Sequence, residues 1–172
     1  MTLQQKMLAK QSKKGFTLVE LVVVIAILAI LAAIAIPAVI GIINSASKSA
    51  GESDASTLNN ACKTVYSGVK SGSITKQSKD NAGNACDWAA DEGASNAART
   101  TAAKAVTIAQ VQKYNGTSLA YEDLYYASTD YDTAHITKGT IVFWDGEGDA
   151  PTGADQPLKE GTTLGDLYGA GA

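Results

Sequence analysis

The sequence predicts an α+β protein in which one long N-terminal helix carries a small head with an antiparallel sheet. Three observations predict it. An apolar run extends from Phe16 to Ile43, apolar residues at helical spacing follow it, and β-branched and aromatic residues are frequent after Gly116. The 172 residues allow one compact domain beside one long non-globular element. Half of the helix is expected to cross a membrane and half to pack on the head.

Charge divides the chain into a short basic N-terminus and an acidic remainder. Residues 1–15 hold four of the 14 basic residues and none of the 17 acidic ones, which leaves 10 minus 17, or −7, for the rest. A basic stretch before an apolar run predicts a leader over residues 1–15 that stays on the cytoplasmic side of a membrane. The acidic remainder argues against nucleic acid as a partner, because phosphate binding needs clustered lysines and arginines.

The apolar run over residues 16–43 predicts a transmembrane or assembly helix. Its interruptions are Thr17, Glu20, Pro37 and Gly41. As a helix it would measure about 42 Å, which exceeds a hydrocarbon core of about 30 Å. A secretory signal peptide is the alternative, but its apolar region would be shorter and followed by a small-residue cleavage site. The tripeptide just past the run, at residues 46–48, fails at its third position, and the tripeptide at residues 33–35 fits but lies inside the run, so such cleavage is not favoured.

Residues 44–172 form the predicted head, which begins with the second half of the long helix. An apolar seam at helical spacing extends this helix to roughly 55 residues, or about 80 Å, until Gly68, Gly72 and Ser73 stop it. The seam consists of Ala55, Leu58, Cys62, Val65 and Val69. Residues 71–93 are predicted as a loop, because they are rich in Ser, Gly, Asn and Asp.

The remaining elements complete the head. Alanines at helical spacing predict a second helix from about Ser95 to Lys113, in which residues 106–108 could instead be extended. Strands are predicted at residues 124–129, 136–144 and 162–168, and one face of their sheet would lie on the seam.

The motif Lys14-Gly15-Phe16-Thr17-Leu18-Val19-Glu20, followed by the apolar residues 21–34, resembles the class III signal of type IV pilins and pseudopilins. The strong resemblance covers residues 14–43, and the rest agrees in layout. It implies a type IV pilin-like fold and cleavage between Gly15 and Phe16 by a prepilin peptidase, which then methylates the new amine of Phe16. The lack of a side chain at Gly15 suits close approach of a protease to the backbone.

Glu20 is the predicted assembly residue, because a carboxylate in a membrane helix is costly and is usually paired or functional. The resemblance implies that its partner is the amine of Phe16 on an adjacent subunit. The alternative is that Glu20 only complements the dipole at the start of the mature helix. Pro37 removes a helical hydrogen bond from the carbonyl of Ala33, so a break is predicted there, helped by Gly41 one turn later. A tolerated kink is the alternative reading.

Two cysteines, Cys62 and Cys86, could form a disulfide that ties the loop to the helix, which would suit an extracellular protein. Two separate thiols are the alternative. Many pilins place a disulfide near the C-terminus, where this chain has no cysteine.

No catalytic residues, cofactors or metal are expected. His135 is the one histidine, and no nucleophile motif accompanies it. The acids of residues 145–149 depart from a calcium-binding loop, so a solvated turn is favoured. Asn115-Gly116-Thr117 matches a glycosylation sequon but is interpreted as a turn.

The sequence therefore predicts a non-enzymatic pilus subunit that polymerises through its N-terminal helix. Its expected partners are other copies of the subunit, the prepilin peptidase, an assembly platform and, before assembly, the cytoplasmic membrane. The filament would lie on the cell surface and serve adhesion, aggregation or twitching motility. The alternative is the main pseudopilin of a type II secretion system or a competence pilin.

Overall fold

The computed structural model describes residues 16–119, 123–128, 137–146, 151, 153 and 155–169. These residues belong to two compact units, one ending at Ser45 and the other beginning at Ala46. The predicted leader, with Gly15 of the predicted cleavage site, lies outside the described residues.

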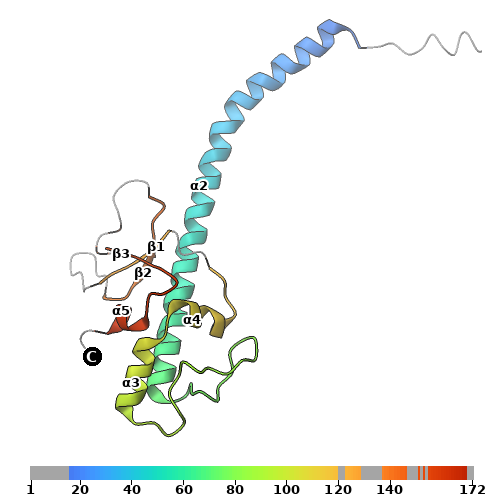
Figure 1. Ribbon diagram of the computed structural model, residues 1–172. Coiled ribbons are helices and arrows are strands. Elements are labelled where there is room, and N and C mark those ends of the chain that lie inside the picture. The colour runs from blue at the N-terminus through green and yellow to red at the C-terminus, as the bar shows by residue number, and fades with distance from the viewer. Residues whose placement is uncertain are drawn as a thin grey trace, which may run out of the picture. The chain divides into compact units, whose positions relative to one another are not determined.

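Helix α2 (Leu18–Ser71) is the long helix and has 54 residues, close to the predicted length (Figure 1). Its buried residues are the five of the predicted seam, which confirms that prediction. Gly68 lies inside the helix and does not stop it. The helix ends at Ser71 because Gly72 turns into the left-handed region at a φ of 84°. Arg99 supports this end by donating from Nη1 to the Ser71 carbonyl at 3.3 Å.

Residues 72–94 form the predicted loop, apart from one isolated bridge between Lys79 and Ala85. The Asp80 carboxylate organises the loop by accepting hydrogen bonds from the backbone N–H groups of Ala82 at 2.9 Å and Asn84 at 2.8 Å. Burial raises the pKa of Asp80, but the hydrogen bonds outweigh this effect, and the net shift is downward. The carboxylate therefore stays ionised and holds the loop at neutral pH.

The second predicted helix is in fact two helices, α3 (Asn96–Ala105) and α4 (Ile108–Asn115). Val106 and Thr107 between them are extended, in agreement with the alternative for residues 106–108, although Ile108 already begins α4. Thr107 starts α4 with a capping box, in which its side chain and that of Gln110 each accept from the other residue's backbone N–H. This local competition for backbone hydrogen bonds explains why the alanine periodicity does not give one helix.

The sheet is antiparallel, as predicted, with strands β1 (Leu124–Tyr126), β2 (Ile141–Phe143) and β3 (Gln156–Pro157) in the order β2-β1-β3. Strands β1 and β2 lie within the predicted ranges. Strand β3 was not predicted, because Pro157 cannot donate a ladder hydrogen bond and proline argues against a strand except at an edge.

The prediction of a strand at residues 162–168 is wrong, since Leu164–Tyr168 is the short helix α5. Thr163 and Asp166 form a capping box at its start, and Leu164 and Leu167 are both buried. The spacing of three between these leucines is helical, so one face of a single turn supplies both to the core.

The core of the second unit lies between the seam of α2 and the elements arranged around it (Figure 1). Its largest fully buried side chains include one from α2, one from α4, one from β2 and two from α5: Leu58, Ile108, Ile141, Leu164 and Leu167. The predicted α+β fold, with a long helix packed on a small antiparallel sheet, is confirmed.

Candidate assembly site

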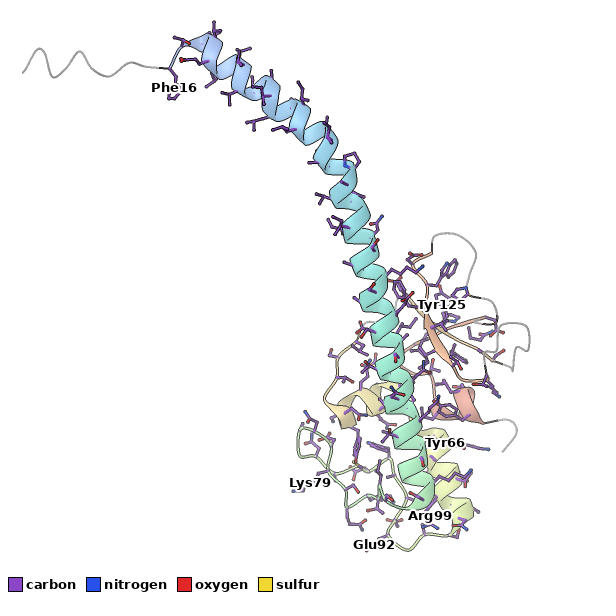
Figure 2. The ribbon with its side chains drawn as sticks, turned by 180° about the vertical axis from the view of Figure 1, so that it is seen from behind. Phe16, Tyr66, Lys79, Glu92, Arg99 and Tyr125 are labelled. Atoms are coloured by element: carbon purple, nitrogen blue, oxygen red, sulfur yellow. The ribbon has the colours of Figure 1, made fainter. Side chains whose placement is uncertain are left out.

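The candidate site is the start of α2, where Glu20 lies in the first turn. Phe16 and Thr17 precede the helix, and the Phe16 residue is 89% exposed (Figure 2). Glu20 is the one residue with a charged side chain among residues 16–45, so any charged side-chain interaction made by this segment centres on it.

Thr17 and Glu20 form a capping box. The Thr17 N–H donates to Glu20 Oε2 at 2.8 Å and the Thr17 hydroxyl contacts the same oxygen at 2.8 Å, while the Glu20 N–H lies 3.2 Å from the Thr17 hydroxyl oxygen. Two backbone donors at the start of the helix are thereby satisfied. The Thr-x-x-Glu spacing in the sequence indicates this cap, which was not predicted.

The capping box uses one carboxylate oxygen and fixes the direction of the other. Both contacts from Thr17 go to Oε2, and no residue that the structure describes hydrogen-bonds to Oε1. Glu20 can therefore complete the cap of its own helix and still accept a charged hydrogen bond from outside the chain.

Apolar side chains cover the rest of the first unit. Every large apolar residue from Phe16 to Ile43 is exposed, and Figure 2 shows side chains projecting outward all along this part of α2. Among the described residues, α2 is the one helix long and apolar enough to cross a membrane. A signal sequence near the N-terminus passes the same test, so the motif at residues 14–20 must decide between the two.

Helix α2 is continuous through Pro37, and the predicted break at Pro37 and Gly41 is not present in this single chain. Two features still weaken this turn. Pro37 has no N–H to donate to the Ala33 carbonyl, and the Ser45 hydroxyl donates to the Gly41 carbonyl at 2.9 Å, a contact that favours helix bending. Unwinding in a filament stays a prediction.

Cys62 and Cys86 are both fully buried in the core of the second unit, and both are free thiols in the structure. Burial raises the pKa of Cys62 to about 12 and also raises the pKa of Cys86. Both thiols are therefore unreactive while the head is folded, because the thiolate is the nucleophile. The disulfide stays a prediction for the secreted protein.

Labelling after unfolding tests this disulfide. Native labelling is uninformative, since burial protects thiols whether or not they are bridged. If the bridge forms, filament protein unfolded without reductant should bind no maleimide and should weigh less than its reduced form by two hydrogens. Two labelled thiols without reductant would rule the bridge out, and reduced protein serves as the control.

The residues considered for calcium binding and glycosylation belong to the second unit and not to this site. Of the three acids considered for calcium, Glu147 and Asp149 lie outside the described residues and Asp145 lies within them, and the described residues contain no group of three metal-ligating side chains. Asn115 ends α4 and donates from Nδ2 to the Val111 carbonyl at 2.9 Å, and Gly116 is left-handed at a φ of 68°. The sequon is thus a helix-terminating turn, as interpreted.

Comparison with known proteins gives one match. Residues 10–36 match the family model described as the prokaryotic N-terminal methylation motif. No curated protein and no solved structure matched the chain. The matched range contains the predicted cleavage site, Phe16, Thr17 and Glu20. The chain thus carries a methylation motif typical of type IV pilins and pseudopilins on a pilin-like α+β fold, which is the organisation of a structural protein and not of an enzyme.

Proposed function

We propose that this chain is a type IV pilin, the repeating subunit of a surface filament used for adhesion, aggregation or twitching motility. The observation that carries the proposal is Glu20, the single acid of the exposed apolar segment 16–43, which lies within a methylation motif. Such a helix must be covered by lipid or by other copies, and a carboxylate within it needs a partner in either setting.

Maturation supplies that partner. The prepilin peptidase hydrolyses the bond between Gly15 and Phe16, which frees the leader and turns the Phe16 amide into an amine that is then methylated. The amine keeps its positive charge after methylation. Before cleavage, residue 16 has only a neutral amide to offer. Cleavage therefore switches on the attraction between Phe16 of one copy and Glu20 of the next.

The capping box favours this pairing geometrically. With Oε2 held by Thr17 at 2.8 Å, the carboxylate is fixed in one orientation before a second copy arrives. A preorganised acceptor loses less conformational freedom on binding. The pair contributes mainly axial register, because its attraction must first offset the desolvation of both charges.

The proposed path from membrane to filament follows from the distribution of charge along the chain. The precursor spans the cytoplasmic membrane with its basic leader on the cytoplasmic side, where the peptidase and the assembly platform act. Assembly transfers residues 16–43 from lipid into the centre of a homopolymer. The weakened turn at Pro37 and Gly41 lets the helix extend there. The heads, with most of the net charge of −7, face outward.

Electron microscopy of cells with an antibody to residues 50–172 tests the proposal. We expect labelled fibres on the cell surface, and none on cells that lack the gene. Antibody that marks only the cell envelope of producing cells, with no surface fibres, would overturn the surface pilin in favour of the pseudopilin alternative.

A further inference from the structure

The segment 160–169, which contains α5, covers the face of α2 that carries Cys62. Tyr66 lies one turn after Cys62 on the same face of α2, and its ring centroid is 5.1 Å from that of Tyr168. Burial, and after it the charge of a Cys62 thiolate, raises the pKa of Tyr168, so the phenol and the thiol lie close together. The segment therefore helps to shield the Cys62 thiol from solvent.

Contacts between segments hold residues 160–169 to the junction of α3 and α4. The Ile108 N–H donates to the Thr162 carbonyl at 2.9 Å, and the Leu164 N–H donates to the Val106 carbonyl at 2.7 Å. Neither bond lies inside α3 or α4, and the capping box that begins α4 uses no residue of the segment. Release of residues 160–169 would therefore leave the internal hydrogen bonds of both helices in place.

The helix within this segment depends on its own cap. α5 has five residues, too few for a helix that is stable alone. The Thr163 N–H donates to Asp166 Oδ2 at 2.8 Å, and the Asp166 N–H lies 3.2 Å from the Thr163 hydroxyl oxygen. This capping box shapes the turn that brings Leu164 and Leu167, both fully buried, into the core cluster that includes Cys62. Loss of the cap would weaken this cover and leave the cap of α4 unchanged.

We propose that residues 160–169 are a lid, which opens while the rest of the head stays folded and thereby exposes Cys62. Proteins open locally in cooperative units, with free energies below that of global unfolding. Opening of the lid exposes Leu164 and Leu167, which keeps the open state rare. A thiol reacts as its thiolate, and burial disfavours that form. The lid, and not the stability of the whole head, therefore sets the rate at which Cys62 reacts. This role does not depend on the filament.

Maleimide labelling of the reduced full chain in detergent, without denaturant, tests the lid, with the label assigned to Cys62 by peptide mass. Thr163→Ala removes the cap of α5, and Thr107→Ala is the matched control, because it removes the same kind of cap from α4, outside the lid. We expect Thr163→Ala to label Cys62 about fivefold faster, the factor that corresponds to about 1 kcal/mol for one cap. Thr107→Ala should leave this rate unchanged, since the cap of α4 is present whether the lid is closed or open.

The two variants distinguish lid opening from unfolding of the whole head. Each loses one cap, so tryptophan fluorescence should show similar destabilisation of the folded head in both. Equal acceleration of Cys62 labelling by both variants would show that Cys62 is exposed only by global unfolding and would overturn the proposal. Unchanged labelling in Thr163→Ala would overturn it as well, because another element would then cover the thiol.

The denaturant dependence of labelling in the unaltered chain is a second test, which needs no variant. The lid exposes less surface than the whole head, so the free energy of opening at Cys62 should fall less steeply with urea than the free energy of unfolding. Equal slopes would contradict a lid.

Discussion

Cells that carry Glu20→Ala should insert the precursor normally and yet display at least about a hundredfold fewer filaments. Removing a charge from the helix eases insertion, by less than the roughly 2.5–3.5 kcal/mol that a charge costs at the helix centre, because Glu20 lies in the first turn. In the proposed filament, the Phe16 amine of the neighbouring copy would then be buried without a counter-charge. Removing one partner of a buried ion pair costs about 3–5 kcal/mol, which is a factor of 100 or more in an association constant.

The Glu20→Gln variant distinguishes the proposed role of the Glu20 charge in assembly from its role in capping the helix. Glutamine is accepted at the third position of a capping box and keeps the contacts with Thr17, but it has no charge. We expect this variant to assemble as poorly as Glu20→Ala. Counting labelled fibres by electron microscopy, with an immunoblot of the membrane fraction for precursor, checks both. Normal fibre numbers from Glu20→Gln would assign Glu20 to the cap of its own helix instead.

Gly51→Ala should destabilise the head, by about 1–3 kcal/mol, although alanine normally stabilises a helix by about 1 kcal/mol relative to glycine. A Cβ at Gly51 would overlap the ring of Phe143, including its Cγ atom. The Cγ atom moves only if Phe143 changes its χ1 rotamer or β2 shifts, and Phe143 packs against the core. The overlap therefore outweighs the gain in helix propensity.

Denaturant unfolding followed by the fluorescence of Trp88 and Trp144 measures this effect. Gly41→Ala is the matched control, since it makes the same change in the same helix and its Cβ would meet no atom within 4 Å. The account predicts a less stable head in Gly51→Ala and an unchanged head in Gly41→Ala, because Gly41 lies in the first unit and both tryptophans lie in the second. A more stable head in Gly51→Ala would show that Phe143 does not rest on Gly51 in solution.

The long helix could be predicted nearly completely, because its signals are local. The apolar run and the seam at Ala55, Leu58, Cys62, Val65 and Val69 depend on spacing within one element. The capping boxes of α4 and α5 are local as well, but they were outweighed by alanine periodicity in one case and β-branched composition in the other. A Thr-x-x-Asp or Thr-x-x-Gln spacing was the missed signal in both.

The contacts that close the head could not be predicted in the same way. Asn59 meets Ile141, and Phe143 rests on Gly51, only because the chain brings distant segments together. Nothing in the local sequence of Asn59 distinguishes it from Asn60. At the candidate site the reverse holds, since Phe16, Thr17 and Glu20 lie within one turn of chain and their spacing is the signal. The assembly role of these residues stays a prediction.

The intact mass of the subunit in purified filaments tests the central claim most directly. The account predicts a chain that begins at Phe16, lacks residues 1–15 and carries one added methyl group on its amine. Functional filaments built from subunits that retain residues 1–15 would contradict it, because no charged amine would then exist at Phe16 to meet Glu20.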